Sequence, residues 1–299
     1  MQRMTTRGLW IWIGALVALT SAVVFYWVPV RQVVKTVQYP VTRTVKYSFT
    51  VKNPNNYPIN HSEFWVYSPV SKSSFQQLSS LISDHPYSEE KDPLGNKRMK
   101  FIIDSLPPYG LKNITVTATV NLSEQGNRIE ESQDLSYLSD EKMIALNDAR
   151  IKRLAGRLKA NTPRETVKRI YDWITKNIKR TGYQKQDLGA RYALTHKSGD
   201  CTEFMYLFSA LARANGIPTR NLSGFTAREN RVLRAADYHN WNEVLIDGEW
   251  HLVDTEKQVF MNNASEYIAM RLIGDPAFRQ SVDAQSFFAS SRDIRVSMR

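Results

Sequence analysis

Cys201 is the one cysteine among the 299 residues of this chain. The residues around it predict that a helix begins there, because Asp200 is a favourable N-cap and Glu203 supplies the returning half of a capping box. A thiol at a helix N-terminus faces unpaired backbone N–H groups and the positive end of the helix dipole, and both favour the thiolate. We therefore predict a nucleophile at Cys201, with a small buried hydrophobe as the alternative.

A histidine and an aspartate lie on either side of a predicted hairpin turn. Asp247-Gly248 separates two apolar-rich runs and indicates a two-residue type I′ turn. With this turn His239 lies opposite Glu256, and Asp254, which pairs with Trp241, lies on the same face two pairs closer to the turn. The side chains of His239 and Asp254 are then diagonal cross-strand neighbours, about 7 to 8 Å apart at the backbone.

The register selects one histidine for this aspartate, since His251 pairs with Val244 and points to the other face. A thiol at a helix start, a histidine on a strand and an aspartate on the next strand are the parts of a nucleophile, base and orienter. Cys201 would attack an acyl carbon, His239 would take the thiol proton, and Asp254 would hold the imidazole tautomer. The spacing leaves open that His239 and Asp254 have structural roles only.

Several separated segments resemble the core of the transglutaminase-like superfamily. They are Gly199-Asp200-Cys201, Gly216-Ile217-Pro218-Thr219-Arg220, Gly224-Phe225, His239-Asn240-Trp241-Asn242-Glu243-Val244 and Gly248-Glu249-Trp250-His251-Leu252-Val253-Asp254. The resemblance covers roughly residues 165 to 262. It implies a papain-like α+β domain, in which the helix bearing the cysteine packs on an antiparallel sheet, and it carries over Cys201, His239 and Asp254 as the catalytic triad.

One position departs from the pattern of the classical cross-linking enzymes. They carry a tryptophan directly after the cysteine, where this chain has Thr202, so thiol chemistry is implied more firmly than protein cross-linking. The oxyanion donor is predicted to be the backbone N–H of Cys201, with Tyr183 or Gln184 as further candidates. A packing or surface role is the alternative for Tyr183.

Helices must position the thiol. An apolar stripe indicates a buried helix that Asn215-Gly216 ends, and it consists of Phe204, Leu207, Phe208 and Leu211. Two helices are expected before it, over residues 139–160 and 162–179, the second opened by a capping box with proline at its first helical position. One more short helix is expected over residues 266–273.

The segment before these helices predicts an all-β sandwich. Apolar and polar residues alternate over residues 44–51, and further strands are expected over 98–103 and 111–122. Asp92–Asn96 resembles part of the β-sandwich that precedes the catalytic core in some transglutaminase-like proteins. We expect a spacer or partner-binding module rather than a catalytic one.

The N-terminus predicts where the chemistry takes place. Leu9–Val28 is a run of twenty residues without a charged side chain, long enough to cross a bilayer as a helix. A cleaved signal peptide with Thr20-Ser21-Ala22 as its cleavage site is the alternative. Because the apolar run continues past that site, we expect an uncleaved single-pass anchor, with the soluble domains on the periplasmic or extracellular side.

The predicted fold class is α+β. The expected organisation is a short basic N-terminus at 1–8, a transmembrane signal anchor at 9–28, a β-sandwich domain at 36–136, a catalytic domain with leading helices at 139–262 and a C-terminal extension at 263–299.

The formal net charge of +11 indicates a solvated surface, which is the usual case, or a face for anionic headgroups, a wall polymer or an acidic substrate. No nucleic-acid motif accompanies it, so nucleic acid is not an expected partner. We expect no cofactor and no metal. A zinc site is a weaker alternative, built from His239, His251, Asp254 and Glu243.

Together these patterns predict a membrane-anchored thiol enzyme with a protein or peptide substrate. It would form a thioester at Cys201 from an amide and pass the acyl group to an amine or to water, giving transamidation, deamidation or peptide hydrolysis. A non-catalytic peptide-binding or assembly scaffold with the same fold is the alternative, since resemblance reports fold more securely than activity. The sequence does not predict the oligomeric state.

Overall fold

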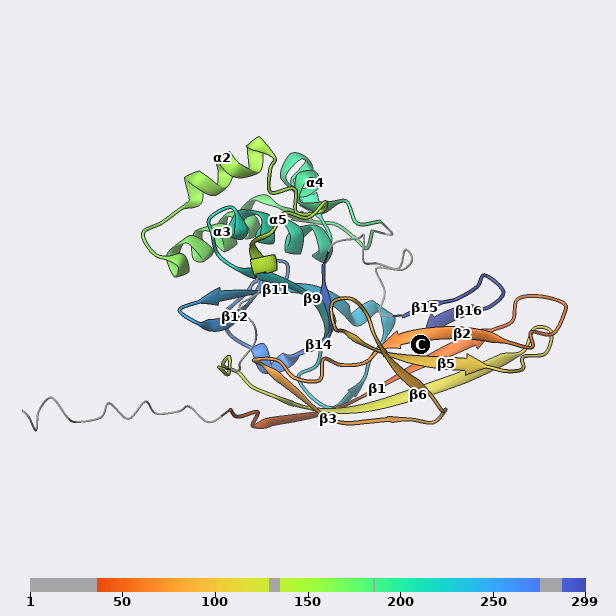
Figure 1. Ribbon diagram of the computed structural model, residues 1–299. Coiled ribbons are helices and arrows are strands. Elements are labelled where there is room, and N and C mark those ends of the chain that lie inside the picture. The colour runs from red at the N-terminus through yellow and green to blue at the C-terminus, as the bar shows by residue number, and fades with distance from the viewer. Residues whose placement is uncertain (1–36, 129–134, 185, 275–286) are drawn as a thin grey trace, which may run out of the picture. The chain divides into compact units, whose positions relative to one another are not determined.

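The computed structural model describes residues 37–128, 135–184, 186–274 and 287–299 (Figure 1). The run Leu9–Val28, with the anchor and the cleavage site predicted there, lies outside these residues. Among the described residues, no helix has both the length and the apolar character needed to cross a membrane.

Two sheets form the sandwich, and the first is built around the long strands β1 (Val41–Lys52) and β6 (Leu111–Leu122). These strands confirm two of the predicted ones and pair antiparallel over their full lengths. β3 (Gln76–Ser83) pairs with the other edge of β6, while β10 (Arg231–Val232) and β16 (Arg295–Met298) pair with β1. The inward positions of β1 are all buried, as the alternation predicts: Val45, Tyr47, Phe49 and Val51.

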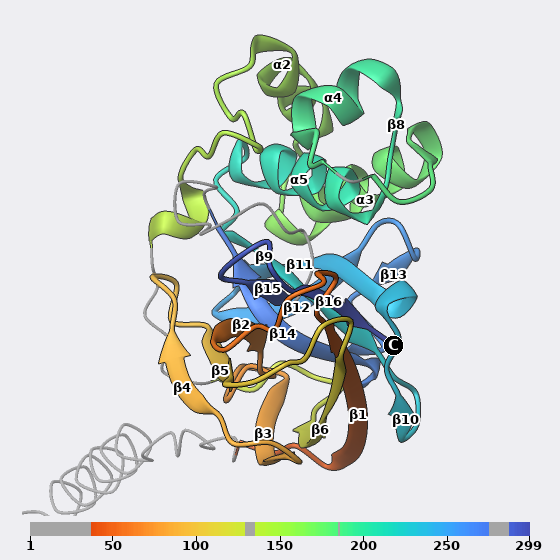
Figure 2. The same cartoon turned by 90° about the vertical axis from the view of Figure 1, so that its right-hand side faces the viewer.

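The second sheet packs against the first (Figure 2). It contains, in order, β15 (Phe287–Ala289), β2 (Ser62–Tyr67), β5 (Lys97–Ile103) and β4 (Ser88–Lys91). Phe49 of β1 contacts Phe64 and Phe287 from this sheet, with ring centroids 6.2 and 5.2 Å apart. These aromatic contacts join the two inner faces into one core.

Three strands of the sandwich come from distant parts of the chain. β15 and β16 lie in the segment predicted as a C-terminal extension, and β10 lies in the segment predicted as catalytic. Each is only two to four residues long. Strands this short show no alternation, so no periodic pattern predicts them.

A third sheet carries the site and has the order β13 (Val259–Phe260), β12 (Glu249–Asp254), β11 (Tyr238–Ile246), β9 (Thr219–Thr226) and β14 (Tyr267–Ile273). The predicted hairpin register is confirmed from Ile246 opposite Glu249 to Asn242 opposite Val253. Its turn residues Asp247 and Gly248 both have positive φ, 53° and 77°, as a type I′ turn requires.

The helix expected over 266–273 is wrong. Tyr267–Ile273 is strand β14, which pairs antiparallel with β9, and only Ala264–Glu266 before it forms a short 3₁₀ turn. The first five residues of the strand are buried. A short strand buried on both faces has no two-residue alternation, so its sequence cannot be told from that of a buried helix.

Side chains of the sandwich satisfy the free edge of β14. The Gln76 side-chain amide accepts from the backbone N–H of Ala269 at 2.9 Å and donates to its carbonyl at 3.0 Å. Asn96 does the same at Leu272, at 2.7 and 2.9 Å. The sandwich thereby closes a sheet edge that would otherwise hold unpaired backbone groups.

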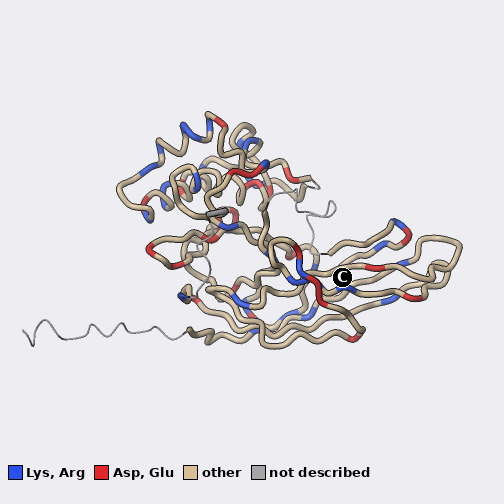
Figure 3. The backbone as a smooth tube through the Cα atoms, in the orientation of Figure 1, with Lys and Arg blue, Asp and Glu red and all other residues tan. Residues whose placement is uncertain are grey.

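Helices cover the opposite side of the third sheet (Figure 1). They are α2 (Ala149–Leu158), α3 (Pro163–Asn177), α4 (Gly189–His196) and α5 (Cys201–Arg213). α5 is buried along nearly its whole length and contacts β11 and β9, so its packing fixes the position of its first residue relative to the sheet. Lys and Arg are frequent along α2 and α3, where they occupy exposed helix faces (Figure 3).

The predicted helix over 139–160 is wrong in its first half. α2 begins only at Ala149, and the chain before it makes turns in which Asp140 accepts from the backbone of Leu146. Asp148 caps α2 by accepting from the Arg150 backbone at 2.8 Å. The reason is local competition, since Asp side chains bond nearby backbone groups in turns and caps more readily than they sit in helix interiors.

Candidate active site

Cys201 lies at the first position of α5, as predicted. Asp200 Oδ1 accepts from the Thr202 backbone at 2.9 Å, and Glu203 Oε2 accepts from the Asp200 backbone at 3.2 Å, so both halves of the capping box are present. A short parallel pair, β7 (Lys179–Arg180) with β8 (Ser198–Gly199), leads into the helix. These contacts hold the half-buried thiol at a defined place.

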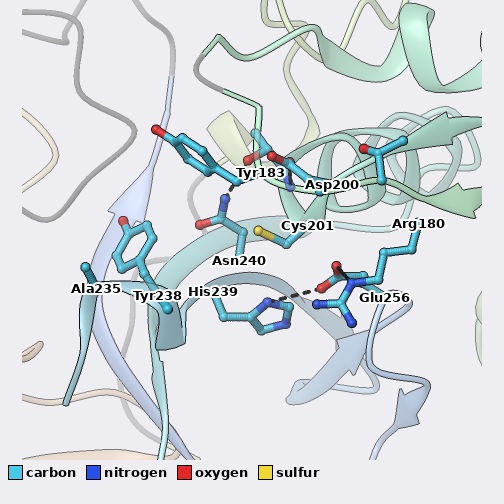
Figure 4. A pocket seen from close by; sticks show the side chains of 13 residues that line it. Arg180, Tyr183, Asp200, Cys201, Ala235, Tyr238, His239, Asn240 and Glu256 are labelled. Carbon is cyan, nitrogen blue, oxygen red and sulfur yellow. Dashed lines mark hydrogen bonds and ion pairs between the residues drawn. The ribbon is translucent and has the colours of Figure 1, made fainter.

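A cavity of about 490 Å³ opens at this helix start. Figure 4 shows the side chains that line it, and those with polar or ionisable groups are Arg180, Thr181, Tyr183, Asp200, Cys201, Thr202, Tyr238, His239, Asn240 and Glu256. They come from the end of β7, the loop after it, the start of α5, the start of β11 and the turn after β12. The thiol is thus on the wall of a space that a substrate side chain can enter.

His239 and Asp254 are hydrogen-bonded, as the hairpin register predicts. His239 Nε2 lies 2.5 Å from Asp254 Oδ2, and both residues are buried. Tyr267 Oη donates to Asp254 Oδ2 at 2.8 Å, and the Lys257 backbone donates to Oδ1 at 2.9 Å. Trp241 stacks beside the imidazole with ring centroids 6.4 Å apart, so the ring is held on its edge and its face.

These partners keep Asp254 ionised. Burial alone would raise the pKa of this carboxyl, but the charge and hydrogen bond of His239, with the bonds from Lys257 and Tyr267, lower it below its ordinary value. Burial, followed by the nearby Asp254 charge, raises the pKa of Tyr267, so its hydroxyl remains a donor. An ionised Asp254 fixes the tautomer of the ring and leaves Nδ1 for other chemistry.

The thiol, the imidazole and one further carboxylate converge. Cys201 Sγ, a ring nitrogen of His239 and a carboxylate oxygen of Glu256 all lie within 4.8 Å of one another. The structure therefore brings together all three residues of the predicted triad. His239 Nδ1 is the nitrogen on this side, because Nε2 is occupied by Asp254.

Glu256 is a site residue to which the sequence prediction gave no role. Its Oε2 lies 3.4 Å from His239 Nδ1, and its Oε1 lies 2.6 Å from Arg180 Nε, with only 4% of the side chain exposed (Figure 4). The predicted register did place Glu256 opposite His239. What it could not show is that Arg180, far away in the sequence, holds this carboxylate against the imidazole.

The prediction that the helix start favours a thiolate is wrong for this structure. Burial raises the pKa of Cys201 to about 12, and the charges of Asp200 and Glu256 act in the same direction. Hydrogen bonds from the Asn240 backbone and the Thr202 side chain oppose the shift without reversing it. Desolvation and two nearby carboxylates thus favour the neutral thiol at this helix start.

The oxyanion candidates differ in position. Tyr183 lines the cavity and is 69% exposed, while the backbone N–H of Gln184 donates to Asp200 Oδ2 at 2.8 Å. Asp200 therefore ties the loop that carries both residues to the start of α5. Asn240 also lines the cavity, and its amide donates to the Thr202 hydroxyl at 2.9 Å.

The weaker zinc hypothesis does not find its ligands together. Glu243 lies 2.7 Å from Arg220 Nε, and His251 pairs with Val244 on the hairpin, as the register predicts. Within the described residues, one group of three side chains has the spacing of metal ligands, and it is Cys201, His239 and Glu256 rather than the predicted set.

Comparison with known proteins agrees with this arrangement. Residues 152–255 match the model of the Transglutaminase-like superfamily. A solved structure from Cytophaga hutchinsonii, described as a candidate cysteine protease, is 19% identical with a TM-score of 0.57, and the match covers 87% of this chain and 92% of that one. The periplasmic domain of TgpA from Pseudomonas aeruginosa, bound to ethylmercury, is 16% identical with a TM-score of 0.38, over 71% of this chain and 90% of that one. No curated protein matches this chain.

At 19% identity and a TM-score of 0.57, the Cytophaga hutchinsonii structure supports the fold and not the reaction. The matched range contains α5 with Cys201 at its start, and the hairpin with His239 and Asp254. Residues 152–255 of this chain therefore match a transglutaminase-like domain.

Proposed function

We propose that this chain is a thiol acyl-transfer enzyme acting on amide bonds. The observation that supports it most directly is the orientation of His239, which bonds Asp254 through Nε2 and turns Nδ1 toward the side where Cys201 Sγ lies. A base aimed at a nucleophile and held by an ionised carboxylate is the geometry that acyl transfer needs.

The first half of the reaction forms a thioester. Cys201 Sγ attacks the amide carbonyl while Nδ1 of His239 accepts the thiol proton, and the tetrahedral oxyanion is met by the Cys201 backbone N–H. The C–N bond then breaks as Nδ1 returns the proton to the leaving amine or ammonia. Asp254 stabilises the imidazolium that forms between these two steps.

The second half releases the acyl group. An amine or a water molecule attacks the thioester carbonyl and gives its proton to Nδ1 of His239. The C–S bond then breaks as Nδ1 returns that proton to Sγ, which regenerates the thiol. Attack by an amine gives transamidation, and attack by water gives deamidation or peptide hydrolysis.

The resting pair is a neutral thiol beside an imidazole. Because the pKa of Cys201 is raised to about 12, the proton leaves as the sulfur attacks rather than beforehand. The reaction is therefore general-base catalysis, unlike that of a preformed thiolate.

The place of the reaction follows from the N-terminal sequence. Leu9–Val28 would anchor the chain in a membrane, with the sandwich at 36–136 and the catalytic domain at 139–262 on the periplasmic or extracellular side. The substrate would be a protein or peptide at that surface, and the exposed positive charge of α2 and α3 suits an acidic one.

A three-readout assay tests the enzyme. The full-length chain is incubated with glutamine-containing peptides, and ammonia release, incorporation of a fluorescent primary amine and peptide cleavage are measured together. Cys201→Ala should abolish whichever product wild type forms, and a trapped acyl adduct should map to Cys201 by mass spectrometry. Full activity in Cys201→Ala would show that this mechanism is wrong.

A peptide-binding scaffold is the second candidate, and one observation favours it. A half-buried thiol with a pKa of about 12 is a poor nucleophile until its surroundings change. A scaffold would bind peptides equally well in wild type and Cys201→Ala and would form no product in any of the three assays. The same experiment therefore separates the two candidates.

A further inference from the structure

Three different ligand types meet at one point of the cavity wall. The sulfur of Cys201, a nitrogen of His239 and an oxygen of Glu256 lie mutually within 4.8 Å, and the Nδ1 to Oε2 distance is 3.4 Å. Ligands of a tetrahedral zinc ion, with bonds of about 2.0 to 2.3 Å, are separated by about 3.3 to 3.8 Å. The cluster is therefore close to the size that a zinc ion requires.

We propose that Cys201, His239 and Glu256 form a zinc-binding site whose fourth position opens to the cavity. Thiolate, imidazole and carboxylate are the ligand types that zinc takes, and three protein ligands with one open position are a known arrangement for it. As the S–Zn bond forms, the thiol proton passes to solvent.

In two of the three proposed ligands, His239 and Glu256, the atom that points away from the ion already has a bonding partner. Asp254 bonds His239 Nε2, which fixes the ring and leaves Nδ1 directed at the ion. Arg180 binds Glu256 Oε1, which leaves Oε2 directed the same way. A carboxylate behind a ligating histidine and a donor behind a ligating carboxylate are the outer-shell partners by which proteins orient metal ligands.

Oε2 of Glu256 is the atom that most needs a partner. It is buried, and among the described residues it has no hydrogen-bond partner, although it lies near His239. A buried carboxylate oxygen left this way costs free energy, and a cation bound to it would recover that cost.

The charge balance of the wall favours a dication. Asp200 and Glu256 both line the cavity near the sulfur, and Arg180 pairs with Glu256 through the other oxygen. A bound Zn²⁺ would be offset by the charges of the thiolate and the Glu256 carboxylate.

Zinc would switch the site off. This consequence depends on the proposed function, because the ion would occupy Sγ and Nδ1, the nucleophile and the base of acyl transfer. Removal of zinc by a chelator would restore both groups. The binding itself can be measured without any substrate, so the two proposals can fail independently.

Metal titration of the full-length, chelator-stripped chain tests the site. Zn²⁺ binding is measured by calorimetry and by metal content after gel filtration, and Co²⁺ is used as a spectroscopic probe, because a thiolate ligand gives a sulfur-to-cobalt charge-transfer band. Cys201→Ser and Glu256→Gln are the test variants. Glu249→Gln is the matched control on the same hairpin, and His85→Ala removes a half-buried histidine outside the cluster that lies 2.8 Å from Asp84.

One Zn²⁺ per chain should bind wild type and both controls alike. Cys201→Ser should lose the charge-transfer band, and Glu256→Gln should bind roughly 10- to 100-fold more weakly while thermal unfolding shows both variants folded. Zn²⁺ should also protect Cys201 from alkylation until a chelator is added. Absence of stoichiometric binding, binding unchanged in both test variants, or loss of binding in His85→Ala would each overturn the site.

Discussion

Glu256 Oε2 lies 3.4 Å from Nδ1 of His239, and Asp254 Oδ2 lies 2.5 Å from Nε2 of the same ring. The imidazole is thus flanked by a carboxylate at each nitrogen. Asp254 orients the ring, as expected of a triad, while Glu256 occupies the side from which the ring must reach the thiol. The first two predictions separate the effects of these two carboxylates.

Glu256→Gln should make Cys201 more reactive. The charge of Glu256 contributes to the raised pKa of the thiol, so its removal should lower that pKa and increase the thiolate fraction at a given pH. In metal-free buffer, alkylation by neutral iodoacetamide at pH 8 should be roughly threefold to tenfold faster than in wild type. Because Cys201 is the one cysteine, the modification needs no correction for other thiols.

The same measurement has an internal control and a clear contrary result. Glu249→Gln removes a carboxylate at the far end of the hairpin, where it pairs with Arg128, and should leave the rate unchanged. The wild-type rate should keep rising from pH 8 to pH 10 without a plateau, since the pKa is about 12. Equal alkylation rates in Glu256→Gln and wild type would show that the charge of Glu256 does not affect the pKa of Cys201.

Asp254→Asn should impair turnover far more than binding. Asparagine keeps the shape but can present its amide to Nε2, which would favour the wrong tautomer and leave the imidazolium without a charge partner. We expect the turnover number to fall by roughly 10²- to 10⁴-fold with a much smaller change in KM. Steady-state kinetics on the substrate found by the three-readout assay provide the check, and a turnover within twofold of wild type would contradict the role.

Glu203 should make stability depend on pH near neutrality. Its carboxylate is buried and accepts from the Leu188 and Asp200 backbones at 2.8 and 3.2 Å. Burial, with Asp200 nearby, raises the pKa of Glu203 to about 7, so the folded chain binds this proton more tightly than the unfolded chain. The stability that protonated Glu203 contributes is fully present below the ordinary pKa of a glutamate, and it is lost as the pH rises through about 7.

Denaturant unfolding at pH 5, 6, 7 and 8 measures this effect. The free energy of unfolding of wild type should decline across that range more steeply than that of Glu203→Gln, which does not titrate. A Glu→Gln change at Glu165, in the first turn of α3, is the matched control and should keep the wild-type slope. If the free energy of unfolding declined with pH equally steeply in Glu203→Gln and wild type, the pKa of the Glu203 carboxyl would not be raised.

Two glycines should respond to alanine in opposite directions. Gly248 has φ of +77° in the hairpin turn, so Gly248→Ala should destabilise the chain by about 1 kcal/mol. Gly156 lies inside α2, and no atom comes within 4 Å of the position that an alanine Cβ would take there, so Gly156→Ala should stabilise the chain by about 0.5 to 1 kcal/mol. Thermal and denaturant unfolding should show these opposite signs, and a neutral Gly248→Ala would argue against the type I′ turn.

Local patterns predicted the parts of the site that depend on residues close in sequence. The capping box at Asp200 and the type I′ turn at Asp247 arise from contacts within a few residues, and the register of the hairpin follows from its turn. His239 and Asp254 therefore met as expected, because one turn fixes all pairs along two strands.

Tertiary structure decided what depends on residues brought together from afar. The placement of Glu256 by Arg180, the pairing of 267–273 as a strand and the recruitment of β15 and β16 into the sandwich all join distant segments. The pKa of Cys201 belongs to the same class, since its direction was set by burial and by Asp200 and Glu256 together. Residue types and spacing thus determined the catalytic groups and their order, whereas desolvation, which only the complete packing establishes, decided their charge state.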